Sequence, residues 1–498
     1  MKHTSVYQNT AFVTALSVAE RALGFLYRIA LARLIGAEGV GIYQIALSHF
    51  FTFRTLGGGG LPVTLSRIVS KNNAENCMRD NPSALLATSL LSLFVTLPLS
   101  LFFLFFAKQT LYAGNSESAS VLQILLLGLS LACVYAVVKG YFWGNKRFVA
   151  PAVLEIVEEI IGVVCGMLLL FSAPNLSPVD GAKRAAFATT LSCVLSFIIA
   201  LFVLRKEKQR RARPREFFKP VLFSAAPITA VRVGTALLNS AVATLFPFML
   251  MKAGMTESEA LTAYGVVSGM VMPLLAMPMT IIGSLSIVLV PELSADYHGN
   301  NPLRLQKNVA RALSFTFLIG AILTPFFLAF GKSFGLLAYG NALSGELLSF
   351  GCAVLLPMSV TAISTSMLNS LGLEKQSFLF SAIGAGVFML CLVFLPAKVG
   401  AHAYLIGMVL QFLLISSCSL ALLFRKIPVP KGFFLRALLC VALIFPVSLF
   451  ATWTLSITTR FLGEIFAPVL SAALTLAFSF GAYKVCGFFT KGAFEKVF

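Results

Sequence analysis

The sequence predicts an all-α polytopic membrane protein with about fourteen transmembrane helices. Only 11% of the 498 residues are charged, while 58% are hydrophobic and the mean hydropathy is +0.90. Soluble domains carry roughly 25% charged residues, so this composition excludes a soluble protein. Apolar runs of about twenty residues, the length that crosses the hydrocarbon core of a bilayer, alternate with polar or Gly/Pro-rich turns.

Fourteen runs meet the length requirement, and each predicts one transmembrane helix. The expected spans are 9–35, 40–65, 83–107, 119–143, 150–172, 185–204, 220–248, 260–290, 309–331, 344–370, 377–396, 401–424, 433–456 and 464–486. The first run is long and charged and lacks a small-residue cleavage site, so we expect a retained span rather than a signal peptide.

The distribution of lysine and arginine predicts the orientation of these spans. About 23 of these residues fall in the turns on the side of the amino terminus, and about 7 fall in the turns on the other side. Positive residues gather on the cytoplasmic side of membrane proteins, so we expect both termini in the cytoplasm. The net charge of +19 then reflects topology, and we expect no nucleic acid partner.

A basic run, "RKEKQRRARPREFFK" at 205–219, divides the chain. We expect an N-lobe of spans 1–6 at 1–204 and a C-lobe of spans 7–12 at 220–424. Spans 13 and 14 follow with a cytoplasmic tail at 425–498. The basic run either contacts anionic phospholipids or only anchors the inner side of the protein.

An internal repeat relates the two lobes. Leu65 and Leu293 lie at the inner ends of the second and eighth spans, and Gly144 and Gly372 follow the fourth and tenth. The members of each pair are 228 positions apart. Repeated six-helix halves of like orientation are typical of transporters, whose substrate binds between the halves. The sequence therefore predicts two pseudo-symmetric lobes around a central cavity.

Arginines within the spans are the candidate binding residues. Arg21 and Arg54 each lie about fourteen residues, roughly 21 Å, below the outer ends of the first and second spans. Arg28 shares a helix stripe with Arg21, and we expect it level with Ser48 and His49. A charge at this depth is costly unless it faces a cavity or a bundle interior. Guanidinium groups bind phosphate oxygens in pairs, so converging arginines indicate a phosphate-bearing substrate.

Two further sets of charged residues have candidate roles. Arg232 lies on the seventh span, which contains no acid, and we expect it to line the cavity opposite the first span and to bind the substrate pyrophosphate with Arg21, Arg28 and Arg54. Glu155, Glu158 and Glu159 are the candidates for ion or proton coupling, because buried carboxylates can titrate near neutral pH. The alternative for Glu155 is a structural ion pair with Lys139 across the same inner turn.

Glycine and proline interrupt one span in each lobe. The residues are Gly57, Gly58, Gly59, Gly60 and Pro62 in the second span, and Pro273 and Pro278 in the eighth. Such breaks weaken helix propagation and allow bending, which predicts hinges for alternating access. The alternative is close helix packing through small residues, which is common in membranes.

The sequence contains no catalytic motif, nucleotide-binding loop or metal constellation, and its nine cysteines show no CxxC spacing. The outer loops are short and hold only scattered acids, so we do not expect an enzyme. We expect no cofactor, and the membrane potential or an ion gradient would supply the energy for transport.

Four stretches carry a resemblance to a known family. They are "LGFLYRIALARLIGAEGVGIYQ" (23–44), "LGGGGLPVTLSRIVS" (56–70), "KGYFWGNKRFVAP" (139–151) and "SLSIVLVPELS" (284–294). The chain resembles the stage V sporulation protein B-like and lipid II flippase-like members of the multidrug/oligosaccharidyl-lipid/polysaccharide (MOP) exporter superfamily, in its polysaccharide-transport branch. The resemblance is diffuse and covers most of the chain.

This resemblance implies a flippase of the bacterial cytoplasmic membrane that moves an undecaprenyl-pyrophosphate-linked cell-wall or polysaccharide precursor, such as lipid II, by alternating access. Spore cortex peptidoglycan synthesis is one setting that it implies. It also implies that Arg21 and Arg54 match essential arginines, that Arg28 matches only loosely, and that 433–456 and 464–486 line a groove for the lipid tail. We expect a monomer.

Two other functions stay open. A cation-coupled multidrug exporter of the same fold would carry exposed acids and aromatic surface in its cavity, whereas the first two spans supply arginines. A membrane scaffold without transport activity would have no use for arginines within its spans.

Overall fold

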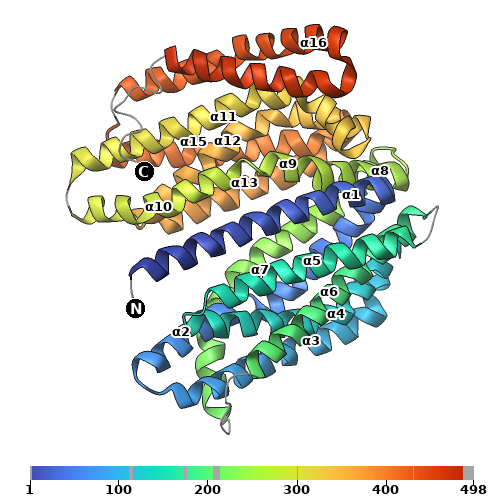
Figure 1. The fold of residues 1–498 in the computed structure, drawn as a ribbon, viewed down its shortest axis with the longest axis vertical. Helices are drawn as coiled ribbons and strands as arrows, with labels where there is room; N and C mark the ends of the chain where they lie inside the picture. Colours follow the sequence, from blue (N-terminus) through green and yellow to red (C-terminus); the bar gives the residue numbers. More distant parts are fainter. Residues whose placement is uncertain are drawn as a thin grey trace. The chain divides into compact units, whose positions relative to one another are not determined.

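The computed structural model describes residues 3–110, 116–172, 176–205, 214–299, 301–429 and 431–485, and in these ranges every regular element is a helix (Figure 1). The helices are α1 (His3–Gly58), α2 (Leu61–Ala74), η1 (Met78–Asp80), α3 (Asn81–Thr110), α4 (Ser116–Gly144), α5 (Val149–Phe171), α6 (Pro178–Arg205), α7 (Arg215–Lys252), α8 (Glu257–Gly265), the π-helical turn η2 (Val266–Val271), α9 (Met272–Ala276), α10 (Met279–His298), α11 (Pro302–Tyr339), α12 (Ala342–Ser370), α13 (Glu374–Phe394), α14 (Pro396–Val399), α15 (His402–Lys426) and α16 (Lys431–Val485).

The two longest helices, α1 and α16, each contain a turn at a single glycine. Gly36 in α1 has φ 73° and ψ 173°, and Gly463 in α16 has φ 70° and ψ 175°. This combination of angles is essentially restricted to glycine, because a Cβ would collide with the backbone. Each glycine therefore separates two spans, as the sequence predicts for the first and last pairs of spans.

Thirteen helices in the described ranges are long and apolar enough to cross a membrane. The region Phe12–Ala74 counts once although the turn at Gly36 divides it, and α5, which carries three carboxylates, is not among the thirteen. The predicted span 260–290 is divided into Glu257–Ala276 and Met279–His298. With these differences, the prediction of an all-α multi-pass membrane protein is confirmed.

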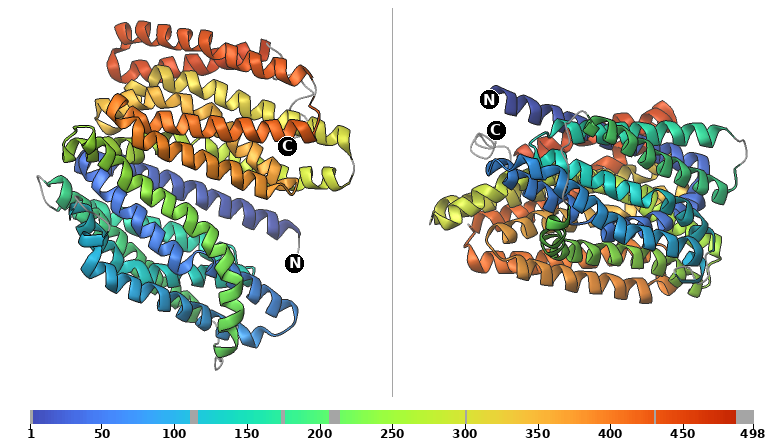
Figure 2. Two further views of the ribbon diagram at one scale, coloured as in Figure 1. Left: turned by 180° about the vertical axis from the view of Figure 1, so that it is seen from behind. Right: turned by 90° about the horizontal axis from the view of Figure 1, so that it is seen from below.

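The chain forms two compact units. The first unit comprises Met1–Pro247 and Glu257–Gly265, and the second unit comprises Phe248–Thr256 and Val266–Phe498. Most of α7, which follows the basic run 205–219 and which the sequence assigns to the C-lobe, is grouped with the first unit. Within that unit, α7 (green) runs beside the second half of α1 (blue), as the left view of Figure 2 shows. Residues 206–213 of the basic run and the tail from 486 lie outside the described residues.

Each unit has its own apolar core, and equivalent core residues recur 228 positions apart. The pairs are Leu61 and Leu289, Leu65 and Leu293, Ala84 and Ala312, and Leu85 and Leu313. The repeat extends to a buried hydroxyl, because Thr88 and Thr316 are both fully buried and each donates to the carbonyl oxygen four residues before it. The internal repeat thus extends from the sequence to the packing of both cores.

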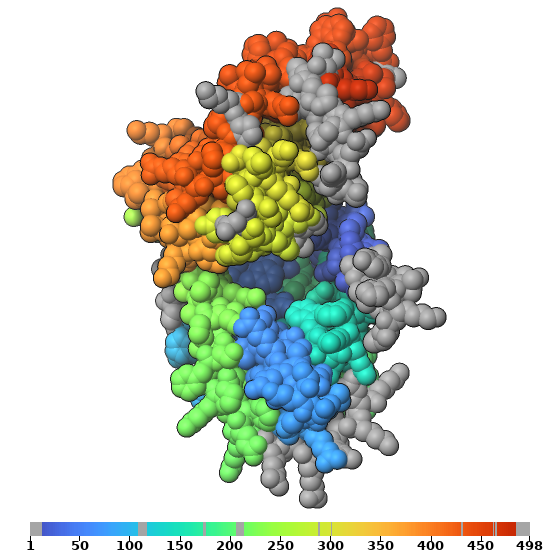
Figure 3. All heavy atoms as spheres, turned by 90° about the vertical axis from the view of Figure 1, so that its left-hand side faces the viewer, coloured from blue at the N-terminus to red at the C-terminus, as the bar shows by residue number. Residues whose placement is uncertain are grey.

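The surface of α16 is rich in exposed aromatic side chains (orange to red in Figure 3). Phe461 and Phe445 are 82% and 71% exposed, and Trp453 is 60% exposed. Such a surface would be unfavourable in water, whereas the hydrocarbon of a bilayer accepts it.

Candidate functional site

The first unit contains a buried ion pair between α4 and α5. Lys139 Nζ lies 3.0 Å from Glu155 Oε1, and the two side chains are only 10% and 30% exposed. The same ammonium group lies 4.7 Å from the centre of the Tyr135 ring. The contact that the sequence offered as the structural alternative for Glu155 is therefore present.

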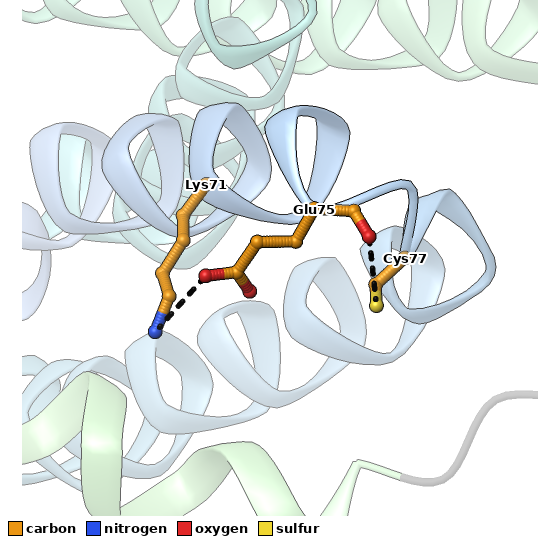
Figure 4. A network of polar contacts seen from close by, with 3 residues as sticks. All are labelled: Lys71, Glu75 and Cys77. Atoms are coloured by element: carbon orange, nitrogen blue, oxygen red, sulfur yellow. Dashed lines mark hydrogen bonds and ion pairs between the residues drawn. The ribbon is translucent and has the colours of Figure 1, made fainter.

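An ion pair at the end of α2 provides a contrast. Lys71 Nζ lies 3.8 Å from Glu75 Oε1, and the side chains are 71% and 57% exposed (Figure 4). Water screens such a pair, which contributes little to stability, typically about 0–1 kcal/mol. The Lys139–Glu155 pair is shorter and largely removed from water, so it fixes α4 against α5 more strongly.

The other carboxylates of α5 face the first half of α1. A Cβ built on Gly24 would lie 2.7 Å from Glu159 Oε1, so this carboxylate lies directly against the α1 backbone. Glu159 interacts electrostatically with Glu20 and Arg28. Glu20 in turn interacts with Glu155, Glu158, Lys139 and Arg21. The structure thus brings the predicted acids of α5 together with Glu20 and with two of the predicted arginines.

The guanidinium groups of Arg21, Arg28 and Arg54 are not locked into ion pairs. Arg21 and Arg28 are exposed and Arg54 is half-buried. Within the part of the chain that the structure describes, no hydrogen bond or ion pair holds any of the three groups. These three side chains therefore remain available to an anion.

The turn at Gly36 sets the relative depths of these arginines. Arg21 lies 15 residues before Gly36 and Arg54 lies 18 residues after it, which corresponds to about 22 and 27 Å. The two depths differ by less than one helical turn, and an arginine side chain can reach across that difference.

The depth expected for Arg28, level with Ser48 and His49, is wrong. The chain turns at Gly36, eight residues after Arg28, so Arg28 is level with the residues next to Tyr43, with which it interacts electrostatically. His49 is directed toward α7, where its Nε2 atom lies 3.3 Å from the hydroxyl of Thr244.

Tyr135 is a site residue that the sequence reasoning missed. Its side chain is fully buried, and its hydroxyl lies beside the Glu158 carboxylate and interacts electrostatically with Glu155 and Arg54. The sequence feature that could have identified Tyr135 is its position one helical turn before Lys139, on the same face of α4. Tyr135 therefore lies between the acids of α5 and the arginine near the end of α1.

Arg232 contacts the break between α1 and α2. Its Nη1 atom donates to the carbonyl oxygen of Gly59 at 2.5 Å, and the nearby Thr229 hydroxyl accepts from the backbone N–H of Gly60 at 3.0 Å. Arg232 belongs to the same unit as Arg21, Arg28 and Arg54.

The predicted hinge residues coincide with the helix interruptions. Gly57 and Gly58 form the end of α1, Gly59 and Gly60 separate it from α2, and Pro62 lies in the first turn of α2. In the second unit, Pro273 lies in the first turn of α9 after the π-helical turn, and Pro278 immediately precedes α10. Among the described residues, no group of three or more His, Cys, Asp or Glu side chains is placed to hold a metal ion.

A surface hollow of about 580 Å³ lies on α16. It is lined by Leu449, Phe450, Thr452, Trp453 and Ser456. The Phe450 ring stacks on Phe478 from the other half of the α16 hairpin, with centroids 4.0 Å apart. The lining of the hollow is mainly apolar and aromatic.

Comparison with known proteins places these features in context. The polysaccharide biosynthesis protein family matches residues 6–295 of the chain. Stage V sporulation protein B of Bacillus subtilis (strain 168) is 24% identical over 403 residues, which cover 77% of this chain and 76% of that protein. The lipid II flippase MurJ of the same organism is 22% identical over 420 residues, which cover 77% of this chain and 76% of that protein.

Two solved structures share the fold. The lipid II flippase MurJ in an inward closed conformation superposes with a TM-score of 0.71 at 16% identity, over 96% of this chain and 99% of that one. An inward-facing multidrug resistance MATE family transporter of the MOP superfamily superposes with a TM-score of 0.68 at 14% identity, over 82% of this chain and 94% of that one.

Proposed function

The chain belongs to the polysaccharide biosynthesis protein family and is a flippase-like transporter of the MOP superfamily, and we propose that it flips an undecaprenyl-pyrophosphate-linked cell-wall or polysaccharide precursor across the bacterial cytoplasmic membrane. A lipid II-like precursor is the favoured substrate, and spore cortex synthesis is a candidate setting. Both termini lie in the cytoplasm in this proposal, the protein acts as a monomer by alternating access, and it performs no enzymatic reaction.

The observation that carries this proposal is the set of three guanidinium groups in α1 that no ion pair with another described residue holds. Arg21 and Arg54 lie on the two arms of one helical hairpin, at depths that a single pyrophosphate group can bridge, and Arg28 lies on the same stripe as Arg21 but about two helical turns nearer to Gly36. Arginine binds phosphate oxygens bidentately, and a bound anion would compensate charges that are costly within a membrane. These three residues are the proposed pyrophosphate ligands.

The acids of α5 are the proposed coupling groups. Glu155 already neutralises Lys139, which leaves Glu158 and Glu159 nearest to an incoming anion. An anion bound beside these carboxylates would favour their protonation, so substrate binding and proton binding would be linked. The membrane potential adds to this coupling, since moving one charge across 100 mV corresponds to about 2.3 kcal/mol.

The hollow on α16 is the proposed contact for the polyprenyl tail. Its aromatic lining and its position on a surface suited to hydrocarbon support this role. Anionic phospholipids are proposed to contact the basic run 205–219. The glycine and proline breaks at Gly57–Gly60 and Pro62, and at Pro273 and Pro278, are the proposed hinges.

A second candidate function is the cation-coupled export of cationic compounds. The observation that favours it is the concentration of Glu20, Glu155, Glu158 and Glu159 in one electrostatic group. The arginines in the same group oppose it, because they would repel a cation. Mutation of the arginines separates the two candidates, since an anion carrier needs them and a cation carrier does not.

The test is the flipping of fluorescent lipid II in proteoliposomes by the wild-type protein, by Arg21→Ala and by Arg54→Ala. Arg33→Ala is the matched control, because Arg33 lies on the same arm as Arg21 but near the turn. We expect both site variants to lose flipping and the control to keep it. Flipping that survives in both site variants would refute the ligand assignment, and a wild-type protein without activity would refute lipid II as the substrate.

A further inference from the structure

The break between α1 and α2 exposes backbone groups that a membrane helix would normally satisfy internally. The Gly59 N–H donates to the Thr55 carbonyl oxygen and the Gly60 carbonyl oxygen accepts from the Thr64 N–H, as in a helix. Pro62, however, has no N–H to donate, and among the described residues the Gly59 carbonyl oxygen and the Gly60 N–H have no helical partner. Unsatisfied backbone groups are costly at membrane depth, so they require partners from a neighbouring element.

Helix α7 supplies partners for both residues of the break. The guanidinium of Arg232 donates to the Gly59 carbonyl oxygen at 2.5 Å, and the Thr229 hydroxyl accepts from the Gly60 N–H at 3.0 Å. Arg232 therefore hydrogen-bonds to the residue that follows α1, and Thr229, one helical turn away on α7, hydrogen-bonds to the residue that precedes α2. From α3, the Ser92 hydroxyl donates to the Gly57 carbonyl oxygen at 2.9 Å.

The packing at this point is close enough to require glycine. A Cβ on Gly60 would lie 2.5 Å from the Ala225 carbonyl oxygen and 2.7 Å from the Thr229 hydroxyl. The backbone angles of Gly60, φ −98° and ψ −17°, are open to any residue, so its requirement is steric and not conformational. The sequence thus keeps α7 in direct contact with the break.

The contact continues along one face of α7. The Thr52 hydroxyl donates to the Ala236 carbonyl oxygen at 3.0 Å, and Thr244 contacts His49. Together with Thr229 and Arg232 these positions recur at helical spacing, so a single polar stripe of α7 follows the second arm of α1. The last residues of α7, from Phe248, are grouped with the second unit.

We propose that Thr229 and Arg232 form a latch that fixes the conformation of the α1–α2 break. In this assignment Arg232 is a positioning residue that acts through the Gly59 backbone, and it does not bind the substrate phosphate. Opening of the latch lets the α1–α2 segment bend at Gly59 and Gly60 during the transport cycle. Only this last consequence rests on the proposed function; the latch itself is a property of the fold.

The first experiment measures amide hydrogen exchange of the purified full-length protein in lipid nanodiscs. Thr229→Val keeps the size and neutral charge of the side chain but removes the acceptor for the Gly60 N–H. We expect exchange in the segment 57–64 to rise about fivefold, the effect of one lost hydrogen bond, while Thr229→Ser, which keeps the hydroxyl, exchanges as the wild type does. Equal exchange in all three proteins would overturn the latch.

The second experiment separates the latch from a phosphate ligand. In the lipid II assay we expect Arg232→Met and Thr229→Val to lower the maximal flipping rate severalfold with an unchanged apparent KM. A raised apparent KM in Arg232→Met, with normal rate and exchange in Thr229→Val, would make Arg232 a substrate ligand. If the wild-type protein moves no lipid II, the proposed substrate fails, whereas the exchange measurement still decides whether the latch exists.

Discussion

The two units share a helical framework but differ in what the framework contains. In the first unit, α4 carries Tyr135 and Lys139, and Arg54 lies near the end of α1. The residues 228 positions later are Ile363, Met367 and Ile282, and all three are fully buried in the apolar core of the second unit. Positions that carry a charged or polar side chain in the first unit therefore carry an apolar side chain in the second.

The carboxylates of α5 are likewise replaced by residues without charge in the second unit. Glu155, Glu158 and Glu159 correspond to Ile383, Gly386 and Val387 on α13 of the second unit. Because the second unit packs without these charges, the helical framework does not need them. Charged residues that the framework does not need, and that are costly within a membrane, indicate function.

The largest effect is expected from making the first unit resemble the second at Arg54. Arg54→Ile replaces the arginine with the residue found at the equivalent position, Ile282, so the fold should be kept. If Arg54 makes two charge-assisted hydrogen bonds to the pyrophosphate, their loss of about 3 kcal/mol lowers lipid II flipping about 100-fold. The control is a conservative change at the equivalent position, Ile282→Val, which should leave flipping unchanged. If Arg54→Ile flips lipid II as fast as the wild type does, this difference between the units has no role in transport.

The next effect concerns the buried ion pair. Glu155→Ile should lower the free energy of unfolding in detergent by about 2–4 kcal/mol, because Lys139 would be left largely buried without its partner. The double variant Lys139→Met/Glu155→Ile copies Met367 and Ile383 of the second unit, and we expect it to recover most of that loss. A double variant less stable than Glu155→Ile would mean that the two frameworks are not equivalent at this point.

Much of the fold was predictable because it follows from local properties of the sequence. The lengths of the apolar runs predict the spans, and Leu65 and Leu293 reveal a repeat that continues into the packed cores. The turn of α1 was predicted only to within a few residues, since several glycines lie near it and only the backbone angles identify Gly36. That small error was enough to misplace the neighbours of Arg28.

The site was predictable in its residue types but not in its pairing. Depth along the helices identifies Arg21 and Arg54, and proximity across an inner turn predicts the Lys139–Glu155 contact. The contact of Arg232 with Gly59 depends on which face of α7 meets α1, and a single sequence does not encode that rotation in any local pattern. Tyr135 was missed because only its position one helical turn before Lys139 distinguishes it from an ordinary core tyrosine among apolar residues.

A smaller effect is expected when the hydroxyl of Tyr135 is removed. This group is buried beside the Glu158 carboxylate, and Ile363 fills the equivalent position in the second unit. Tyr135→Phe should therefore lower the free energy of unfolding by about 0.5–1.5 kcal/mol, the effect of one lost hydrogen bond. An unchanged or higher stability in denaturation measurements would show that the hydroxyl makes no net favourable contact with Glu158.

The smallest difference is expected between the two buried threonines of the repeat. Thr88 and Thr316 have the same burial, and each donates to a carbonyl oxygen one turn back, at 2.7 and 2.9 Å. Thr→Val at either position preserves the side-chain volume and removes one hydrogen bond, so each variant should lose about 0.5–1.5 kcal/mol of unfolding free energy. The two values should agree within about 0.5 kcal/mol in parallel denaturation measurements. Because these threonines belong to the shared framework and not to the charged site, unequal losses would show that the cores of the two units differ even where their residues match.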